Sequence, residues 1–267
     1  MNKMKILSGA DLAEYIKVRQ AGQVRALRQA EGVNPQLSII VTKQDPVINT
    51  YVRLKKSYGA DILIDVEIHN ISQNEAVETI KKLNKTKEIH GIIVQLPLEN
   101  ASQTEEILNT IIPNKDVDGL GVKASFDPAT PTAINWLLAG YNVDLNSKKI
   151  AIIGNGRLVG RPLYDMWVQA GFDVTMVERG DDLQASLRDK DLIIAATGQP
   201  GIVKSECIPI GSIVVDAGVA SDSGETLGDV DKAVYQRDDL TITPRIGGVG
   251  PLTVAALFDN VIRSARP

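Results

Sequence analysis

Residues 149–162 read KIAIIGNGRLVGRP, and this stretch decides the fold that we expect for the second half of the chain. An apolar run ending at Ile153 predicts a buried strand, and Gly154 and Gly156 then allow backbone conformations that a side chain would obstruct. A helix predicted over Leu158–Ala170 would offer unpaired N–H groups and its positive dipole end to a phosphate. The order of strand, glycine turn and helix predicts a dinucleotide site.

The glycine turn alone is a weak signal, because glycines also form tight turns that bind no ligand. Its spacing has one residue more than GxGxxG between the second and third glycines. The strand predicted over residues 173–177 supports the site, because it ends in Glu178 and Arg179, where a ribose partner is expected. A carboxylate such as Glu178 accepts the hydroxyls of an NAD ribose, whereas Arg179 pairs with the 2′-phosphate of NADP. An exposed strand end is the alternative interpretation for both residues.

Further strands are predicted over residues 192–196, 212–216 and 240–243. Ligands of such sheets lie at the carboxyl ends of the strands, so the turns that follow these strands should border the cofactor. The residues predicted to bind the cofactor are Gly154, Asn155, Gly156, Arg157, Glu178, Arg179, Thr197, Gly198 and Val219.

The first half of the chain shows the same alternation of apolar and amphipathic runs, which is typical of βα repeats. Its predicted strands cover residues 36–42, 61–69 and 91–95, and its predicted helices cover residues 46–56, 74–83 and 104–111. A last helix is predicted over Pro251–Ala265, with proline in its first turn. The fold class is therefore α/β with two domains, the second of them Rossmann-like, and a boundary near residues 120–145.

The composition indicates a cytoplasmic globular protein. The chain has 267 residues and a formal net charge of −4, so neither nucleic-acid nor membrane binding is indicated. No apolar run approaches the roughly 20 residues of a membrane span, and the N-terminus lacks the features of a signal peptide. The single Cys207 excludes an internal disulfide and is typical of a reducing cytosol. No metal site is expected, because the two histidines and one cysteine show no ligand spacing.

Polar residues of the first half are candidates for a chemical site. Tyr51 and Lys55 are four residues apart, so a helix places them on one face, although such a pair more often lies on an ordinary surface. Gln95 ends a predicted buried strand, where its amide needs partners. Asp116 and Asp118 of NKDVDG either join the site or cap a turn. All of them follow βα elements, so they can meet at one edge of the domain.

Six segments in this order give the chain a family resemblance: TYVRLKK, GIIVQLPL, PNKDVDGLG, ATPTAI, GNGRLVGRP and GGVGPLTVAAL. The chain resembles the bifunctional methylenetetrahydrofolate dehydrogenase/methenyltetrahydrofolate cyclohydrolase family from Ser8 to its last helix. The resemblance implies an N-terminal α/β folate-binding domain (residues 1–125 plus the C-terminal helix 251–267) and a Rossmann-like NAD(P)-binding domain (residues 126–250). It also implies a cleft between them, a homodimer, tetrahydrofolate substrates, and a place in the one-carbon metabolism that serves purine biosynthesis.

The resemblance further implies roles for individual residues. The catalytic set is Lys55, Gln95 and Asp118, and the substrate-binding set is Tyr51, Lys55, Gln95, Asp118, Gly248 and Pro251. Lys55 matches the catalytic lysine, Asp118 the aspartate that holds the pterin, and Tyr51 the tyrosine that stacks on the aminobenzoyl ring. A lysine moves protons near neutral pH only if its pKa falls, through desolvation or neighbouring cations. Arg53 and Lys56 are the candidate cations.

The chain departs from the family pattern on the folate side. It has Pro46-Val47-Ile48 where PAS is usual, Leu54 where serine precedes the lysine, and a shortened segment after Asp118-Gly119. Arg245 and Ile246 replace valine and proline. The first hypothesis is a bifunctional enzyme that uses NADP. The second is an NAD-linked dehydrogenase with weak or no cyclohydrolase activity, and the third is a non-catalytic folate- or nucleotide-binding paralogue.

Overall fold

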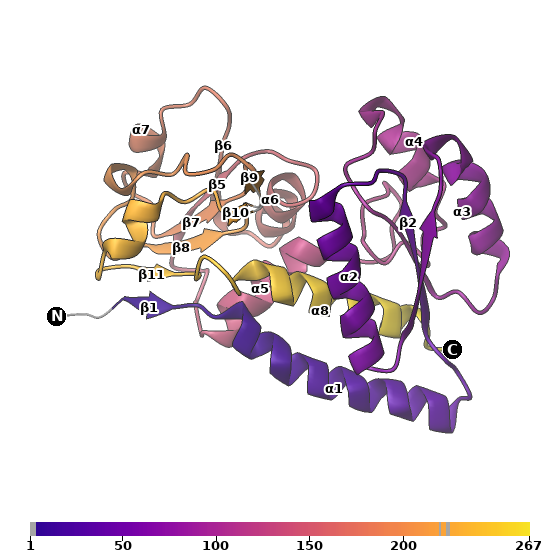
Figure 1. Ribbon diagram of the computed structural model, residues 1–267. Coiled ribbons are helices and arrows are strands. Elements are labelled where there is room, and N and C mark those ends of the chain that lie inside the picture. The colour runs from indigo at the N-terminus through magenta and orange to yellow at the C-terminus, as the bar shows by residue number, and fades with distance from the viewer. Residues whose placement is uncertain (1–3, 219, 223–224) are drawn as a thin grey trace. The chain divides into compact units, whose positions relative to one another are not determined.

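The computed structural model describes residues 4–218, 220–222 and 225–267, and its contacts divide the chain into two compact units (Figure 1). The six-stranded unit contains the N-terminal residues up to Ala13 and Thr130–Thr253. The three-stranded unit contains Glu14–Ala129 and Val254–Pro267. The boundaries predicted for the functional domains remain a prediction: residues 1–125 with 251–267 for the first domain, and residues 126–250 for the second.

The six-stranded unit is built on a parallel sheet with the strand order β1-β11-β8-β7-β5-β6. Its sheet strands are β1 (Lys5–Ile6), β5 (Lys149–Ile153), β6 (Asp173–Val177), β7 (Leu192–Ala195), β8 (Ile213–Asp216) and β11 (Thr241–Ile242). Its other elements are α5 (Ala129–Gly140), α6 (Gly160–Gln169), α7 (Leu183–Leu187), η3 (Ser205–Cys207), η4 (Lys232–Gln236) and the hairpin of β9 (Ala220–Asp222) and β10 (Glu225–Leu227). Strand β6 pairs with one edge of β5, and the chain then crosses to the other edge of β5, where β7 and β8 follow in order. The order therefore reverses at β5 and β7, where such sheets bind ligands.

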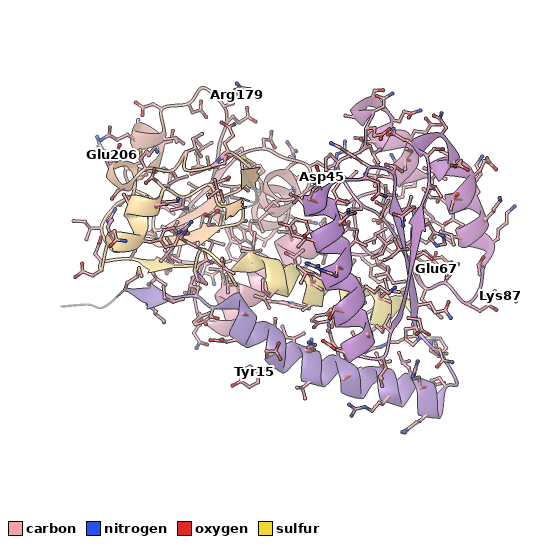
Figure 2. The ribbon with its side chains drawn as sticks, viewed as in Figure 1. Tyr15, Asp45, Glu67, Lys87, Arg179 and Glu206 are labelled. Atoms are coloured by element: carbon pink, nitrogen blue, oxygen red, sulfur yellow. The ribbon has the colours of Figure 1, made fainter. Side chains whose placement is uncertain are left out.

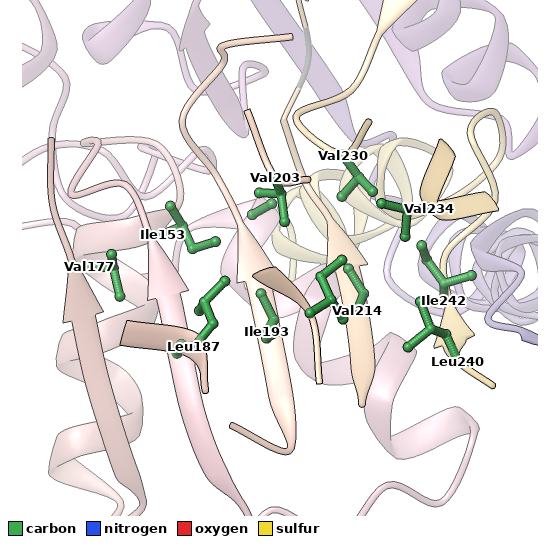
Figure 3. Close-up of a cluster of buried hydrophobic side chains, with 13 residues drawn as sticks. Ile153, Val177, Leu187, Ile193, Val203, Val214, Val230, Val234, Leu240 and Ile242 are labelled. Atoms are coloured by element: carbon green, nitrogen blue, oxygen red, sulfur yellow. The ribbon is translucent and has the colours of Figure 1, made fainter. Parts of the chain in front are cut away.

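Apolar side chains of these strands and of the segments that connect them form one buried cluster (Figure 3). Strands β5 and β7 are almost wholly apolar rather than alternating, which is typical of a parallel sheet buried on both faces. The cluster consists of Ala151, Ile153, Val177, Leu187, Ile193, Ala195, Val203, Ile208, Val214, Val230, Val234, Leu240 and Ile242. It fixes the strand ends from which the predicted cofactor-binding residues follow.

Strand β1 comes from the N-terminus and was not predicted from the sequence. The amide of Lys5 donates to the carbonyl of Leu240 (3.1 Å), and the amide of Leu7 donates to the carbonyl of Ile242 (2.9 Å). Two residues are too few to show a period, so the strand leaves no pattern in the sequence.

The three-stranded unit contains a parallel sheet with the order β3-β2-β4. Its elements are α1 (Gly9–Ala30), β2 (Gln36–Val41), α2 (Pro46–Asp61), β3 (Asp65–Asn70), η1 (Gln73–Glu75), α3 (Ala76–Lys85), β4 (Gly91–Val94), η2 (Ala101–Gln103), α4 (Thr104–Asn109) and the second part of α8 (Val249–Ser264). A single parallel bridge from Ile92 to Asp116 extends the sheet beyond β4. This bridge aligns the segment that contains Asp118 with the end of β4.

Helix α1 was also not predicted, because small and polar residues occupy much of its buried face. Gln20 is fully buried there, and its amide donates to the carbonyl of Ala255 in α8 (2.8 Å). The hydroxyl of Tyr58 donates to the other atom of that amide (2.7 Å), and the Tyr58 ring stacks on Phe258 with centroids 5.2 Å apart. Helices α1, α2 and α8 are therefore tied together by one buried polar chain within this unit.

Helix α2 continues to Asp61, beyond the predicted end at Lys56, and β3 begins at Asp65 rather than at Asp61. The reason is Gly59, which has low helix propensity but a packing role here. A Cβ atom at Gly59 would lie 2.5 Å from a methyl group of Val66. The glycine lets β3 pack closely on the helix, so the helix runs through it.

Candidate functional site

Helix α2 presents two of the predicted site residues. Asp45 caps its start, because the carboxylate accepts hydrogen bonds from the amides of Val47 (2.8 Å) and Ile48 (3.4 Å) (Figure 2). Pro46 follows at the first helical position, which favours a helix start. Tyr51 and Lys55 then lie four residues apart on one helix face, both half-buried.

The amine of Lys55 donates a hydrogen bond to Oε1 of Gln95 at 2.7 Å. The Nε2 atom of Gln95 donates to the carbonyl of Leu96 (3.1 Å), which fixes the orientation of the amide. The backbone amide of Gln95 continues the sheet by donating to the carbonyl of Ile40 (2.9 Å). The end of β4 therefore holds a neutral acceptor against the lysine.

The two aspartates of NKDVDG have different tasks. Asp116 is 2% exposed and caps a turn, because its carboxylate accepts the amides of Gly119 (3.0 Å) and Gly121 (2.7 Å). Asp118 lies next to Lys55, close enough for each charge to affect the other. Of the two alternatives raised by the sequence, Asp116 therefore caps a turn, and Asp118 is the aspartate that lies beside Lys55.

Helix α8 holds the segment that contains Asp118. The amide nitrogen of Asn260 donates to the carbonyl of Val117 (2.9 Å), and Asn260 is 3% exposed. The hydroxyl of Ser264 donates a hydrogen bond to the carbonyl of Asn114 (2.6 Å). Asn260 was not predicted from the sequence, in which it could have been noticed as a lone amide on the apolar face of the last helix.

Burial sets the charge state of the site. Desolvation lowers the pKa of the Lys55 amine, and the Asp118 carboxylate acts in the opposite direction. Desolvation raises the pKa of Asp118, which Lys55 opposes. The predicted role of Arg53 and Lys56 is not supported, because both are exposed and burial is the main cause of the lowered pKa.

The glycine turn of the six-stranded unit follows β5. Gly154 has a φ of +99°, and a Cβ atom there would lie 2.6 Å from the carbonyl oxygen of Ala196. A Cβ atom at Gly160 would lie 1.7 Å from the carbonyl oxygen of Gly154. At Gly156 the nearest such atom is 3.9 Å away. The fold itself therefore requires Gly154 and Gly160, while Gly156 leaves open space in which the backbone can approach a phosphate.

Replacing Gly160 with alanine should therefore disrupt the turn. The added carbon meets backbone rather than a flexible side chain, so we expect a loss of at least about 2 kcal/mol in the free energy of unfolding, measured with urea. Gly22→Ala is the control, because nothing lies within 4 Å of its added carbon in the middle of α1. That variant should gain up to about 1 kcal/mol. Equal unfolding curves for Gly160→Ala and the unchanged protein would contradict the packing argument.

The residues that follow β6 are hydrogen-bonded to the glycine turn. The amide nitrogen of Asn155 donates to Oε1 of Glu178 at 2.6 Å, and the backbone amide of Glu178 donates to Asp181 (2.8 Å). Arg179 is exposed at the outer edge of the loop after β6 (Figure 2). Arg157 is exposed in the turn itself. The Glu178 carboxylate is thus held by Asn155, whereas the side chain of Arg179 is exposed to solvent.

The remaining predicted residues also occupy this unit. The amides of Thr197 and Gly198 follow β7 and donate to the carboxylate of Asp229. Gly248 precedes α8, and Pro251 lies in its first turn. Val219 lies outside the described residues.

The structure therefore brings Lys55, Gln95 and Asp118 together within the three-stranded unit, with Tyr51 one helical turn from Lys55. The predicted cofactor residues that the structure describes, which are all of them except Val219, follow strand ends of the six-stranded unit. Across residues 4–218, 220–222 and 225–267, no group of three or more acidic, histidine or cysteine side chains could hold a metal ion. In the same described part of the chain, no helix is long and apolar enough to cross a membrane.

A doubly wound parallel sheet with a glycine turn at its switch point, together with a unit that buries a lysine beside a carboxylate, defines a two-domain nucleotide-binding α/β protein. Residues 7–118 match the family model for the tetrahydrofolate dehydrogenase/cyclohydrolase catalytic domain. Residues 128–267 match the model for the NAD(P)-binding domain of the same family. The chain belongs to the tetrahydrofolate dehydrogenase/cyclohydrolase family.

Individual relatives agree with this assignment. The chain is 36% identical to the bifunctional protein FolD of Campylobacter jejuni, over 98% of this chain and 99% of that protein. A crystal structure of the C. jejuni bifunctional enzyme superposes with a TM-score of 0.91 at 35% identity, covering 98% of both chains. The Trypanosoma brucei dehydrogenase-cyclohydrolase, solved with NADP cofactor and an inhibitor, superposes with a TM-score of 0.92 at 28% identity, covering 99% of this chain and 98% of that one.

Proposed function

We propose that this protein oxidises 5,10-methylenetetrahydrofolate to 5,10-methenyltetrahydrofolate with NADP and hydrolyses the product to 10-formyltetrahydrofolate. The observation that carries the proposal is a buried Lys55 amine, bonded to Gln95 and facing Asp118, in a member of this family. A lysine with a lowered pKa is suited to proton transfer near neutral pH.

The hydrolysis step needs a group that can both accept and return a proton. Water adds to the methenyl carbon and loses one proton, which leaves a neutral carbinolamine. The ring nitrogen then gains a proton as its bond to that carbon breaks, and the hydroxyl group releases its own proton to solvent as the formyl C=O forms. The neutral amine of Lys55 accepts the proton from water, and the resulting ammonium donates to the nitrogen. Overall, the methenyl cation and water yield the formyl product and one free proton. Gln95 holds the amine in place without adding charge.

Two other residues would bind the folate. Asp118 offers carboxylate oxygens to the N–H donors of the pterin, which makes a charge-assisted pair. The ring of Tyr51, on the same helix face as Lys55, offers a stacking surface for the aminobenzoyl group. Gly248 and Pro251 complete the proposed substrate set.

The glycine turn and the strand ends would hold the dinucleotide. The backbone at Gly156, with its open space, and Arg157 would face the phosphates. Thr197 and Gly198 would border the cofactor at the end of β7, as would Val219 farther along the chain. When bound, the dinucleotide supplies the acceptor for the hydride that leaves the methylene carbon of the folate.

Arg179 favours NADP, because its exposed guanidinium is available to a 2′-phosphate. We expect Arg179→Ala to raise the KM for NADP about tenfold, as loss of a charge-assisted bond would, and to leave the KM for NAD unchanged. Arg188→Ala removes an exposed arginine from the same unit and is the control. An equal effect of Arg179→Ala on the KM values of both dinucleotides would assign Arg179 a role other than phosphate recognition.

One observation favours the second candidate, an NAD-linked dehydrogenase with weak or no cyclohydrolase activity. Asn155 fixes one oxygen of Glu178, so the carboxylate is placed at the strand end where a ribose hydroxyl is expected. A negative charge there also disfavours a 2′-phosphate. Glu178 and Arg179 therefore act in opposite directions on cofactor choice.

An absorbance assay with 5,10-methylenetetrahydrofolate and either NADP or NAD tests the proposal directly. It follows the reduced dinucleotide and the methenyl compound together. We expect turnover with NADP at the higher rate and no accumulation of the methenyl compound. Faster turnover with NAD and accumulation of that compound would support the second candidate, and no turnover with either would favour a non-catalytic paralogue. We also propose a homodimer, which light scattering would detect.

A further inference from the structure

Two aspartates lie where the strands of the six-stranded unit end, and Asp216 is partly buried whereas Asp229 is fully buried. Asp216 is the last residue of β8, and its Oδ1 atom accepts the amides of Gly218 (3.1 Å) and Asp229 (3.0 Å). Its Oδ2 atom accepts the amide of Val230 (3.1 Å). Val230 belongs to the buried cluster of Figure 3 and bridges to Val203 after β7. The pair is thus anchored in the core of this unit.

Asp229 reaches from there to the turn after β7. It is fully buried, and its Oδ2 atom accepts the amides of both Thr197 and Gly198. Two glycines make room for the pair. A Cβ atom at Gly218 would lie 2.0 Å from Oδ1 of Asp229, and one at Gly228 would lie 2.0 Å from Oδ2 of Asp216. Any side chain at these positions would displace the carboxylates.

The Oδ1 atom of Asp229 is buried and has no hydrogen-bond partner among the residues that the structure describes. An ionised oxygen in that position is unfavourable, and two adjacent carboxylates do not readily ionise together. A proton on Oδ1 removes the charge from that oxygen and the repulsion between the two carboxylates, and it disturbs no observed hydrogen bond, because all of them use other oxygens. The hydrogen-bond pattern therefore indicates that the pair retains one proton.

The surroundings of the pair agree with this. Burial raises the pKa of Asp216 to about 6, and the neighbouring charge of Asp229 adds to the shift, which the amides of Val230 and Asp229 oppose. Burial also raises the pKa of Asp229. The other titratable or charged groups facing Asp216 are Tyr235 from η4, which it contacts, and Arg245 beside Tyr235. Both carboxyl groups therefore keep a proton to higher pH than an exposed aspartate does.

We propose that Asp229 is a positioning residue for the dinucleotide, because its carboxyl group holds the turn at Thr197–Gly198 in shape and retains a proton beside Asp216. This role rests on the proposed function, since it concerns how the cofactor-binding edge is kept in place.

The sign of the pH dependence follows from the charge. Burial raises the pKa of both carboxyl groups, that of Asp216 to about 6, so the pair retains a proton in mild acid and gains a negative charge as the pH rises, at the edge where an anionic dinucleotide binds. Affinity for the dinucleotide should therefore fall as the pH rises through this window. An amide at position 229 keeps an acceptor for Thr197 and Gly198 and does not titrate, so it imitates the protonated state.

The experiment measures the dissociation constants of NADP and NAD by calorimetry between pH 5 and pH 8 for the full chain. Asp229→Ala should raise both constants at least about tenfold, because it removes the carboxylate that accepts the amides of Thr197 and Gly198 and so fixes the turn. Asp229→Asn should restore near-normal binding and weaken the pH dependence, because only Asp216 of the pair then titrates. The 2′-phosphate of NADP also titrates near pH 6, so NAD and the difference between variants separate the two effects.

Asp231→Asn is the matched control, because Asp231 lies two residues along and bonds instead to Lys204 and to the amide of Ala233. It should bind both dinucleotides normally. Equal binding by Asp229→Ala and the unchanged protein would overturn the positioning role. Parallel pH profiles for Asp229→Asn and the unchanged protein would overturn the proton on Asp229, and that comparison holds even if the alanine variant does not fold. An unchanged protein that binds neither dinucleotide would overturn the proposed function itself, and this role with it.

Discussion

Replacing Lys55 with methionine is expected to lower the cyclohydrolase rate at least about 100-fold while dinucleotide binding survives. A general acid–base group contributes roughly 100- to 10,000-fold to a reaction, and methionine has a similar length but no proton to transfer. Dinucleotide binding should persist, because every residue proposed to hold the cofactor belongs to the other compact unit. The measurements are methenyl hydrolysis, followed by absorbance, and the dissociation constant of NADP.

The loss should not come from unfolding. Burial lowers the pKa of Lys55, so the folded state binds this proton less tightly than the unfolded state does. The lysine therefore lowers stability at neutral pH, and its contribution improves only as the pH rises from the folded pKa towards the unfolded one. Lys56→Met removes an exposed charge one residue along the same helix and should keep full activity. Hydrolysis that continues at a normal rate in Lys55→Met would remove Lys55 from the mechanism.

The sequence predicted the interior strands well because burial on both faces leaves unmistakable apolar runs. Among the strands buried along their length, 149–153 has the predicted limits, and 91–95 and 192–196 each end one residue early. The strand over 173–177 also has its predicted limits, although it lies at the edge of its sheet and is mostly only partly buried. Helix α6 begins at Gly160 rather than at the predicted Leu158. The residues before Gly160 belong to the turn, which brings Gly160 against the carbonyl group of Gly154. Limits that depend on local apolar pattern were therefore predictable.

Elements stabilised by distant contacts were not predictable from local pattern. Helix α1 buries Gln20, and its partner is the carbonyl of Ala255, far along the chain. Strand β1 is only two residues long and exists because β11 accepts it. Helix α5 runs through the region that the sequence suggested as a domain boundary. Tertiary contacts override local pattern at all three places.

The candidate site shows the same division. Lys55, Gln95 and Asp118 could be named from sequence because they lie in segments that resemble a family, and the structure brings them together. Asn260 and Asp229 could not, because each acts on the backbone of a segment that is distant in sequence. The difference in role between Asp116 and Asp118 also required coordinates, since only the turn geometry shows which carboxylate is already satisfied.

Replacing Asp118 with asparagine should raise the KM for the folate substrate at least about tenfold, because a charge-assisted pair with the pterin becomes a neutral hydrogen bond. It should also move the acid limb of the cyclohydrolase pH profile to lower pH. The Asp118 carboxylate raises the pKa of Lys55 against the effect of burial, so its removal lets that pKa fall further. The neutral amine then persists at lower pH. Initial rates across the acid and neutral range would measure both effects.

Stability separates this role from a purely structural one. Burial raises the pKa of Asp118, so the folded state binds this proton more tightly than the unfolded state does, and stability falls as the pH rises from the unfolded pKa to the folded one. At neutral pH the carboxylate therefore lowers stability, and Asp118→Asn should unfold no more easily than the unchanged protein. Asp127→Asn, an exposed position on the same segment, is the control and should leave KM and pH profile unchanged. If Asp118→Asn raised KM without moving the acid limb, Asp118 would bind substrate without tuning Lys55, and a normal KM would exclude Asp118 from pterin binding.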